Sequence, residues 1–308
     1  MKVKLTKLNN AKAKDNLQFS LLAAPAVIYF LVFNYFPMFG LTMAFQEFKY
    51  DLGFFGSKFI GLKNFEFFFT SQDAWRVIRN TVGYGAVFII VGIITQVAVA
   101  LLLFEIRKKG AIKYFQTTMM LPNFLSWVIV GYFAYILFNP IIGVFNQVFI
   151  FLNLSPIDWY TQPQYWPYIL TLANVWKGVG MGAVIYYASL LAIDSELFEA
   201  AKIDGAGKWQ QIRNISIPSL TPLMAILSIM AVGNLFRGDF GLFYQVPRDV
   251  GVLYPATDII DTYIFRGLRN GTLGQASAVG LVQSVVGLVL VLGANFITNK
   301  INPENSLF

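Results

Sequence analysis

The sequence predicts an all-α protein that crosses a membrane six times, with both ends of the chain on the cytoplasmic side. Hydrophobic residues make up 56% of its 308 residues and charged residues only 13%, which is about half the charged share of a soluble globular domain. The apolar residues gather in six runs, each about as long as a helix needs to cross hydrocarbon roughly 30 Å thick. Lys and Arg are concentrated in alternate connections between these runs, as in polytopic membrane proteins.

The six predicted spans form a single domain over residues 17–308, preceded by a basic tail at 1–16. The spans cover residues 17–39, 80–104, 116–138, 166–193, 218–236 and 273–298. A secretory signal peptide is the competing interpretation of the first run, because a basic start precedes an apolar stretch. The small residues at 23–26 lie near the beginning of that run, where a cleavage site is not expected. An uncleaved span is therefore favoured.

The distribution of Lys and Arg predicts the orientation. Basic residues are enriched in the tail at 1–16, in the turn at 105–115 and in the loop at 194–217. The outer connections contain about as many acidic as basic residues, and the stretch at 139–166 has no Lys or Arg. Since positively charged connections stay in the cytoplasm, we expect both termini and the loop at 194–217 to be cytoplasmic. The net charge of +7 follows from this topology and does not indicate a nucleic-acid partner.

Several chemistries are excluded by residues that the sequence lacks. With no Cys and no His, the chain cannot use thiol catalysis, disulfides or His-based metal and proton chemistry. It has no Gly-rich loop ending in Lys-Ser or Lys-Thr, so it is not expected to bind ATP by that route. It also has no cluster of nucleophile and base. We therefore expect no catalytic residue, no metal site and no cofactor in this chain.

The loop at 194–217 is predicted to carry helices of its own. Ser195 is expected to cap the first, with Glu199 adding negative charge near its N-terminus. Gly205 is expected to end this helix, because a tight turn there favours a positive φ. Apolar residues three apart then predict a second short helix, which ends where Pro218 opens the next span. A simple connection does not need this structure, so the loop is predicted to bind a partner.

The spacing of residues in this loop is specific. Glu-Ala-Ala is followed, after three intervening residues, by Gly205. After nine more intervening residues come Ile215, Ser216, Ile217 and Pro218. The loop thereby resembles the coupling loop of permease subunits of binding-protein-dependent ABC importers, in which Leu replaces the second Ile. The resemblance implies that the helix docks on an ATPase. The coupling residues would be Glu199, Ala200, Ala201, Asp204, Gly205 and Pro218.

Two outer segments extend the resemblance to the whole chain. The residues at 61–65, Gly-Leu-Lys-Asn-Phe, look like the segment after the first span in sugar permeases of the maltose-transporter type. The segments at 234–245 and 254–258 look like those of the subgroup that imports oligosaccharides or polysaccharides. The chain is thus identified as resembling a permease subunit of that subgroup.

The resemblance implies a set of partners and a location. A second, non-identical permease would complete the pore, two ABC ATPase subunits would bind ATP and Mg, and an extracellular or periplasmic sugar-binding protein would deliver carbohydrate. The assembly would lie in the bacterial plasma membrane as a multi-pass complex. The alternative is a secondary transporter or channel for a small solute. Titratable groups deep in the spans would favour it, and Lys177 is the one candidate that the sequence offers.

A sugar path needs aromatic faces and hydrogen-bonding groups in the spans. The candidates are Lys177, Trp176, Asn174, Asn234 and Tyr187. A lysine at such depth costs about 2.5–3.5 kcal/mol on insertion scales, so it faces a cavity or a partner. Lys177 is interpreted either as a pore-lining group that binds sugar hydroxyls or as a snorkelling or structurally paired lysine.

Charged residues also crowd the last outer segment. Those predicted to dock the binding protein are Arg237, Asp239, Arg248 and Asp258. The alternative is a solvated loop whose charges neutralise one another.

Overall fold

The computed structural model describes residues 18–301, so the predicted tail at 1–16 lies outside the described residues. Five helices in the described part are long and apolar enough to cross a membrane, and one bent pair of helices makes a sixth crossing if it is counted as a single span. The fold is an all-α polytopic membrane fold. Four short 3-10 turns in the described residues are η3 (Leu121–Phe124), η4 (Trp159–Thr161), η5 (Pro163–Tyr165) and η7 (Gly251–Leu253).

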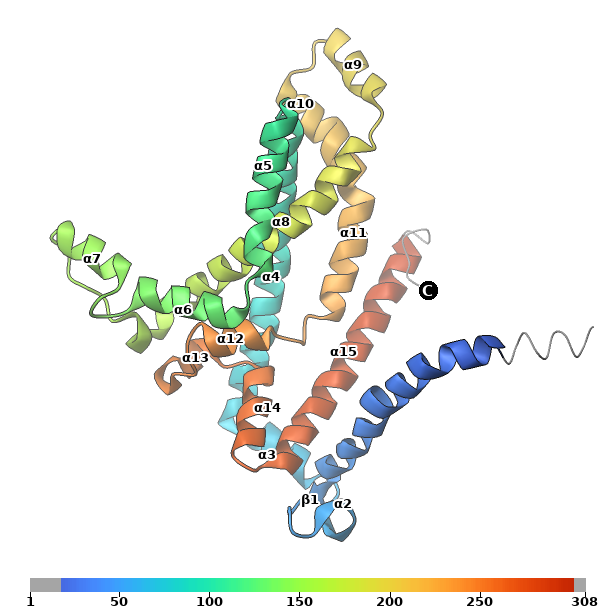
Figure 1. Ribbon diagram of the computed structural model, residues 1–308, viewed down its shortest axis with the longest axis vertical. Helices are drawn as coiled ribbons and strands as arrows, with labels where there is room; N and C mark the ends of the chain where they lie inside the picture. Colours follow the sequence, from blue (N-terminus) through green and yellow to red (C-terminus); the bar gives the residue numbers. More distant parts are fainter. Residues whose placement is uncertain (1–17, 302–308) are drawn as a thin grey trace, which may run out of the picture.

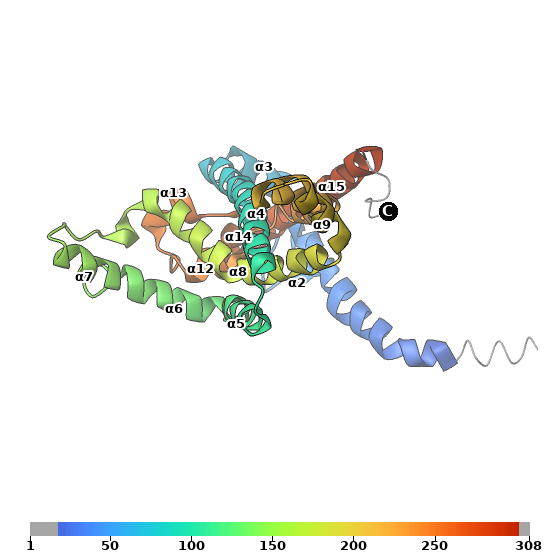
Figure 2. The same ribbon diagram turned by 90° about the horizontal axis from the view of Figure 1, so that it is seen from above.

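The first helix packs against the rest of the chain near its C-terminal end, where it meets the last span. It runs from Gln18 to Phe45, beyond the predicted end at residue 39, through a π turn, η1 (Leu31–Tyr35), and a 3-10 stretch, η2 (Phe36–Phe45). Pro37, at the start of η2, explains the change of helix type, because proline cannot continue the α-helical hydrogen-bond ladder. Figures 1 and 2 show this blue helix extending away from the other elements.

A short two-stranded ribbon follows the first helix. β1 (Gln46–Glu47) pairs antiparallel with β2 (Lys58–Phe59), and α2 (Gly53–Gly56) lies between them. α3 (Lys63–Thr70) then leads to α4. The Asn64 amide donates to the backbone carbonyl oxygens of Ala44 and Gln46, at 2.9 and 3.0 Å, and so fixes the ribbon against α3.

Three spans form the centre of the bundle: α4 (Gln72–Glu105), α8 (Trp166–Leu191) and α11 (Ile217–Gly233). α4 starts eight residues before the predicted span, because Ser71 caps it by accepting a hydrogen bond from the Ala74 N–H. Tyr186 of α8 is fully buried against residues of α4 and α11. The centre thus combines spans from both halves of the chain.

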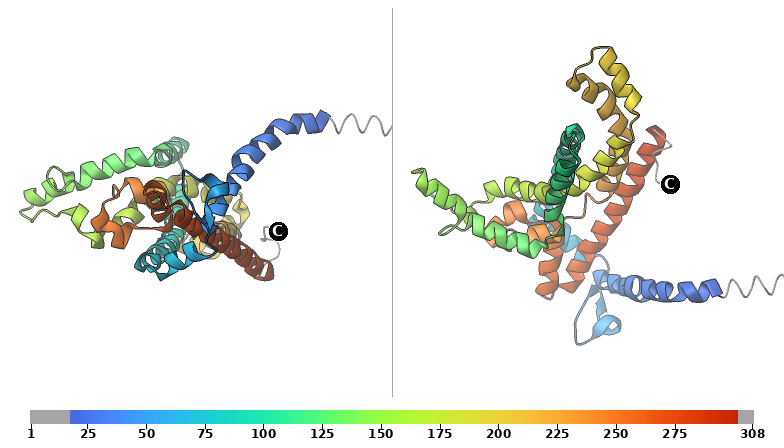
Figure 3. Two further views of the ribbon diagram at one scale, coloured as in Figure 1. Left: turned by 90° about the horizontal axis from the view of Figure 1, so that it is seen from below. Right: turned by 45° about the horizontal axis from the view of Figure 1, so that its top comes forward.

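The third predicted span, 116–138, is a bent pair of helices. α5 (Lys109–Met120) and α6 (Trp127–Phe138) meet at an angle of 97°. Pro122 lies in the turn between them, and the Ser126 hydroxyl caps α6 by accepting from the Ile129 N–H. α6 and α7 (Val144–Phe151) project from the body on the side opposite the first helix (Figures 2 and 3).

The segment at 237–272 is part of the core. It contains α12 (Phe240–Gln245), α13 (Tyr254–Thr257) and α14 (Ile260–Arg269), followed by the last span, α15 (Leu273–Ile301). The fully buried residues that it contributes to the cluster around Trp166 include Leu242, Val246, Leu253 and Ile259. Residues 237–259 therefore lie in the interior of the bundle, between α4, α6 and α8.

Candidate functional site

The loop at 194–217 forms a helical projection at one end of the molecule (Figure 1). Its first helix is α9 (Ser195–Ile203). The cap is Asp194, not Ser195 as predicted: the Asp194 carboxylate accepts a hydrogen bond from the Glu196 N–H at 3.0 Å. The prediction missed by one residue because Asp and Ser are comparable caps.

The end of α9 is a tight turn centred on Gly205. The Ala206 N–H donates to the Ala201 carbonyl at 2.8 Å, and the Gly205 N–H donates to the Lys202 carbonyl at 3.1 Å. This pair of bonds is the Schellman motif, which needs a left-handed residue at the Gly205 position. Gly205 has φ +78°, so the conformation expected from the sequence is confirmed.

The second helix of the loop does not end at Pro218, and that prediction is wrong. α10 (Lys208–Gln211) continues through a π turn, η6 (Ile212–Ser216), directly into α11, so one helix runs from Lys208 to Gly233. The π turn closes with the Ile217 N–H donating to the Ile212 carbonyl. Proline lacks a donor and crowds the carbonyl four residues before it. A wider turn at this position lets the helix accommodate the ring.

Two contacts anchor the loop to the end of α4. The Lys208 ammonium lies 2.6 Å from the Glu105 carboxylate, and the Phe198 ring lies 5.7 Å from the Phe104 ring. Each half of the loop therefore has one contact with the same neighbouring span.

The opposite side of the loop is open to solvent. Glu199 is exposed and makes no ion pair with any described residue. Leu197, Ile203 and Trp209 are large apolar side chains that are 53%, 87% and 71% exposed. Of the other predicted coupling residues, Ala200, Asp204 and Pro218 are exposed and Ala201 is half-buried. An acidic group beside exposed apolar side chains is suited to docking in a groove of a partner that carries a basic residue.

A second group of predicted residues meets at Trp127, which the sequence did not single out. The Lys177 ammonium donates to the Asn123 carbonyl at 2.8 Å and lies 5.2 Å from the centre of the Trp127 ring. The Trp127 indole N–H donates to the Asp239 carboxylate at 2.7 Å. A candidate path residue and a candidate docking residue thus share one indole. No signal in the sequence links residues 127 and 239, because the contact depends on the break between α5 and α6.

The other candidates for the sugar path lie in different places. Trp176 lines an apolar groove of about 520 Å³ between α6 and α8. Asn234 and Arg237 line a separate cavity of about 220 Å³ between α11 and α15. Tyr187 packs beside the cluster of α4, α8 and α11, and Asn174 is half-buried on α8. No cavity in the described residues joins the five candidates for the sugar path, Lys177 included.

Asp258, predicted to dock a partner, is fully buried in the described chain. Its two carboxylate oxygens each accept a hydrogen bond from Arg266 at 2.7 Å, and one also accepts from Arg76 at 2.8 Å. Burial alone would lower the pKa of Arg266, but the hydrogen bond and the charge of Asp258 outweigh burial and raise it. In this conformation Asp258 ties α14 to α4 and cannot itself touch a docking protein.

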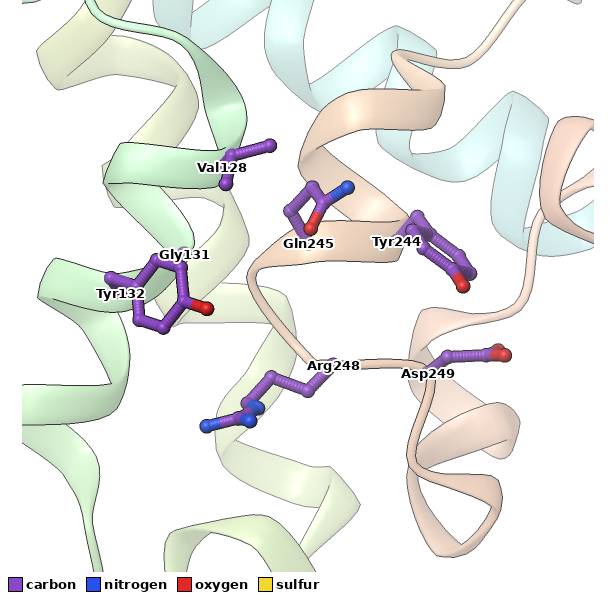
Figure 4. A pocket seen from close by; sticks show the side chains of 7 residues that line it. All are labelled: Val128, Gly131, Tyr132, Tyr244, Gln245, Arg248 and Asp249. Carbon is purple, nitrogen blue, oxygen red and sulfur yellow. The ribbon is translucent and has the colours of Figure 1, made fainter.

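The last docking candidate, Arg248, lies in a turn that follows α12. Both Arg248 and Asp249 have a positive φ, +59° and +51°. The Arg248 guanidinium carbon lies 4.1 Å from the centre of the Tyr135 ring on α6. The side chain borders a cavity between α6 and α12 (Figure 4).

These features define a helical membrane protein with a structured projection at one end and polar cavities within its bundle. The model of the family described as "Binding-protein-dependent transport system inner membrane component" matches residues 89–303. The chain belongs to this family, whose members are non-catalytic transport subunits.

Similar proteins cover nearly the whole chain. Protein LplB of Bacillus subtilis is 32% identical, over 92% of this chain and 89% of LplB. The polygalacturonan/rhamnogalacturonan transport system permease protein YteP of the same organism is also 32% identical, over 92% of this chain and 88% of YteP.

Two solved structures are also similar. One is a chain from a bacterial ABC transporter involved in the import of the acidic polysaccharide alginate; it has a TM-score of 0.86 and 32% identity, and the match covers 96% of this chain and 99% of that chain. The other is from a bacterial alginate ABC transporter in complex with an alginate-pentasaccharide-bound periplasmic protein. Its TM-score is 0.84, also at 32% identity, over 95% of this chain and 97% of that chain.

Proposed function

We propose that this chain is one permease subunit of an ATP-driven ABC importer for oligosaccharides or polysaccharide fragments in the bacterial plasma membrane. A second permease would complete the pore, and two ATPase subunits would bind ATP and Mg and hydrolyse the ATP. An extracellular or periplasmic binding protein would deliver the sugar. The observation that carries the proposal is the unpaired, solvent-facing side of α9, which bears the coupling pattern around Glu199.

The geometry of the loop explains how force would reach the path. α9 follows α8, and α10 is continuous with α11 through the π turn. The contacts of Lys208 and Phe198 with α4 connect the loop to that helix as well. A push on α9 from a closing ATPase would therefore move α4, α8 and α11 together. These three helices form the centre of the bundle.

The similar proteins support a sugar with acidic units. One is named for polygalacturonan and rhamnogalacturonan, and another is from a transporter of alginate, which its title describes as an acidic polysaccharide. We therefore propose that the imported oligosaccharide carries carboxylates.

Charge reversal at the coupling face tests the function. The complete complex would be reconstituted in liposomes, and uptake of a labelled acidic oligosaccharide measured with and without ATP. We expect ATP-dependent uptake by the wild type and none by Glu199→Lys. Glu66→Lys is the matched control. It reverses an exposed carboxylate on α3, at the end of the molecule opposite α9 (Figure 1), and the complex that carries it should take up the sugar normally. Uptake by the purified chain alone, driven by an ion gradient, would instead support a secondary transporter.

A further inference from the structure

We propose that the cavity between α6 and the turn after α12 is a binding subsite for one acidic sugar unit, and that Arg248 binds the carboxylate of that unit. The inference rests on the proposed function, because it names the chemistry of a sugar that the importer would carry. Figure 4 shows the cavity, with Tyr132 on one side and Tyr244 and Gln245 on the other.

The cavity has the size and lining of a small polar site. Its volume is about 230 Å³, below the roughly 300–1,000 Å³ of sites that enclose a drug-sized ligand. It therefore suits one unit of a longer chain. Tyr132 is 63% exposed, so its ring is available to stack on a sugar face. The Gln245 amide and the Tyr244 hydroxyl are hydrogen-bonding groups that suit sugar hydroxyls.

Close packing fixes the shape of this cavity. A side-chain carbon added at Gly131 would come within 2.7 Å of the Gln245 carbonyl oxygen, and one added at Gly241 would meet the Trp127 ring. α6 and α12 therefore approach as closely as their backbones allow. The same contact places the cavity next to the group formed by Lys177, Trp127 and Asp239.

The turn that presents Arg248 is strained. Two consecutive residues other than glycine have a positive φ, Arg248 at +59° and Asp249 at +51°. Such conformations cost about 1–3 kcal/mol each and persist where the surroundings hold them, often at functional sites. Here Asp249 is held from one side: it accepts a hydrogen bond from the Tyr254 hydroxyl at 3.0 Å and lies 3.8 Å from the Arg266 guanidinium.

The backbone conformation of this turn directs the charged side chains of Arg248 and Asp249 to different sides. Figure 4 shows Arg248 and Asp249 pointing in different directions, Arg248 toward α6 and Asp249 away from it. The contact with Arg266 offsets the negative charge of Asp249 at the edge of the cavity. Since like charges would repel a carboxylate ligand, this arrangement favours an anion beside Arg248.

Arg248 has no acidic partner among the described residues, unlike Arg76 and Arg266, which both pair with Asp258. Its guanidinium instead lies over the Tyr135 ring at 4.1 Å. This cation–π contact stabilises the guanidinium beside α6, and no described carboxylate occupies its N–H groups. A guanidinium with free N–H groups can donate two parallel hydrogen bonds to the two oxygens of a carboxylate. A neutral sugar would not use this charge.

The test compares an acidic sugar with its neutral methyl ester. The complete complex with its binding protein would be reconstituted in liposomes, and uptake of a galacturonate trisaccharide compared with uptake of its fully methyl-esterified form. We expect Arg248→Gln to slow uptake of the acidic trisaccharide by about 10- to 100-fold, the effect of losing a hydrogen bond to a charged group. Uptake of the ester should change by less than about twofold. Arg269→Gln, which removes an exposed arginine at the end of α14 in the same segment, is the matched control and should not discriminate between the sugars.

A second variant guards against a folding defect. Arg248→Lys keeps the positive charge but loses the two-pronged geometry, so we expect acidic uptake between those of the wild type and Arg248→Gln, with an increased KM. An active wild-type complex in which Arg248→Gln slows both sugars equally, or neither, would overturn the subsite alone. A wild-type complex that moves neither sugar would contradict the proposed function as well.

Discussion

The loop at 194–217 and the segment at 237–272 both place charged residues between apolar spans, yet they use the charge in opposite ways. In the loop, Glu199 is exposed and has no ionic partner among the described residues. In the segment, Asp258 is fully buried and two arginines bind it. Charge that is paired inside the chain stabilises the fold, whereas charge left unpaired on a rigid element is available to another molecule. Four substitutions test this difference.

The largest expected effect is on transport, from Gly205→Val. A β-branched residue strongly disfavours φ +78°, the value at Gly205, so the turn after α9 would reorganise and the face around Glu199 would move. We expect ATP-dependent uptake to fall below detection while membrane insertion and thermal stability change little. Gly207→Ser is the control, because Gly207 has φ −68° and serine is a good cap there. Equal loss of transport in both variants would show that the left-handed turn is not what matters.

Asp258→Ala should produce the largest change in stability. It leaves the half-buried guanidinium groups of Arg76 and Arg266 without the fully buried carboxylate that pairs with them, and removal of one partner from a buried pair costs about 3–5 kcal/mol. Thermal unfolding of the purified chain in detergent measures the effect. Asp73→Ala removes a more exposed carboxylate from the same Arg76 and should cost less than about 1 kcal/mol. Similar costs for the two variants would contradict a buried structural role for Asp258.

Gly131→Ala should have an intermediate effect. The added methyl group would meet the Gln245 carbonyl at 2.7 Å, so α6 and α12 would have to separate, at a cost of about 1–3 kcal/mol. Gly178→Ala on α8 is the matched control, because no atom lies within 4 Å of the added carbon, and alanine favours a helix. If the unfolding temperature of Gly131→Ala is equal to or above that of the wild type, α6 and α12 are not packed as closely as described.

The smallest expected effect concerns Asp261. Burial raises the pKa of its carboxyl above 3.8, and hydrogen bonds from the Gly238 N–H and the Gln283 amide offset this in part. The folded chain therefore binds the proton more tightly than the unfolded chain. The resulting stability is present below pH 3.8 and is lost as the pH rises through the raised pKa. The measurement is the free energy of unfolding as a function of pH, and Asp261→Asn should not show this decrease. Identical pH profiles for the wild type and Asp261→Asn would contradict a raised pKa for Asp261.

The same comparison explains what the sequence could predict. The loop is encoded locally: the left-handed Gly205, the helix before it and the pattern around Glu199 all lie within a few residues, so the family and the turn could be inferred. The cap was misplaced by one residue because Asp194 and Ser195 are both good caps. The sequence did not predict that α10 continues through Pro218 into α11, because a π turn has no clear sequence signal.

The segment at 237–272 could not be predicted in the same way, because its partners are distant in the chain. Arg76 and Asp258 are separated by 182 residues, and composition alone cannot distinguish a buried pair from a solvated one. The bend of 97° between α5 and α6 likewise changed what Lys177 and Asp239 contact. Pro122 indicated an interruption but not its angle. Long-range pairing therefore determined which predicted charges remained available.

The most direct test of the coupling claim is site-specific cross-linking. The chain has no cysteine, so Lys202→Cys, at an exposed position one turn after Glu199 on α9, introduces a single thiol into this chain. A photoactivatable cross-linker can be attached to this thiol in the assembled, transport-active complex. We predict a cross-linked product between this chain and the ATPase subunit whose yield changes when ATP is added. The equivalent thiol from Glu66→Cys, at the other end of the molecule, should give no such product. An active complex in which Lys202→Cys gives no ATPase product, or in which both positions give equal yields, would contradict the docking of α9 on the ATPase.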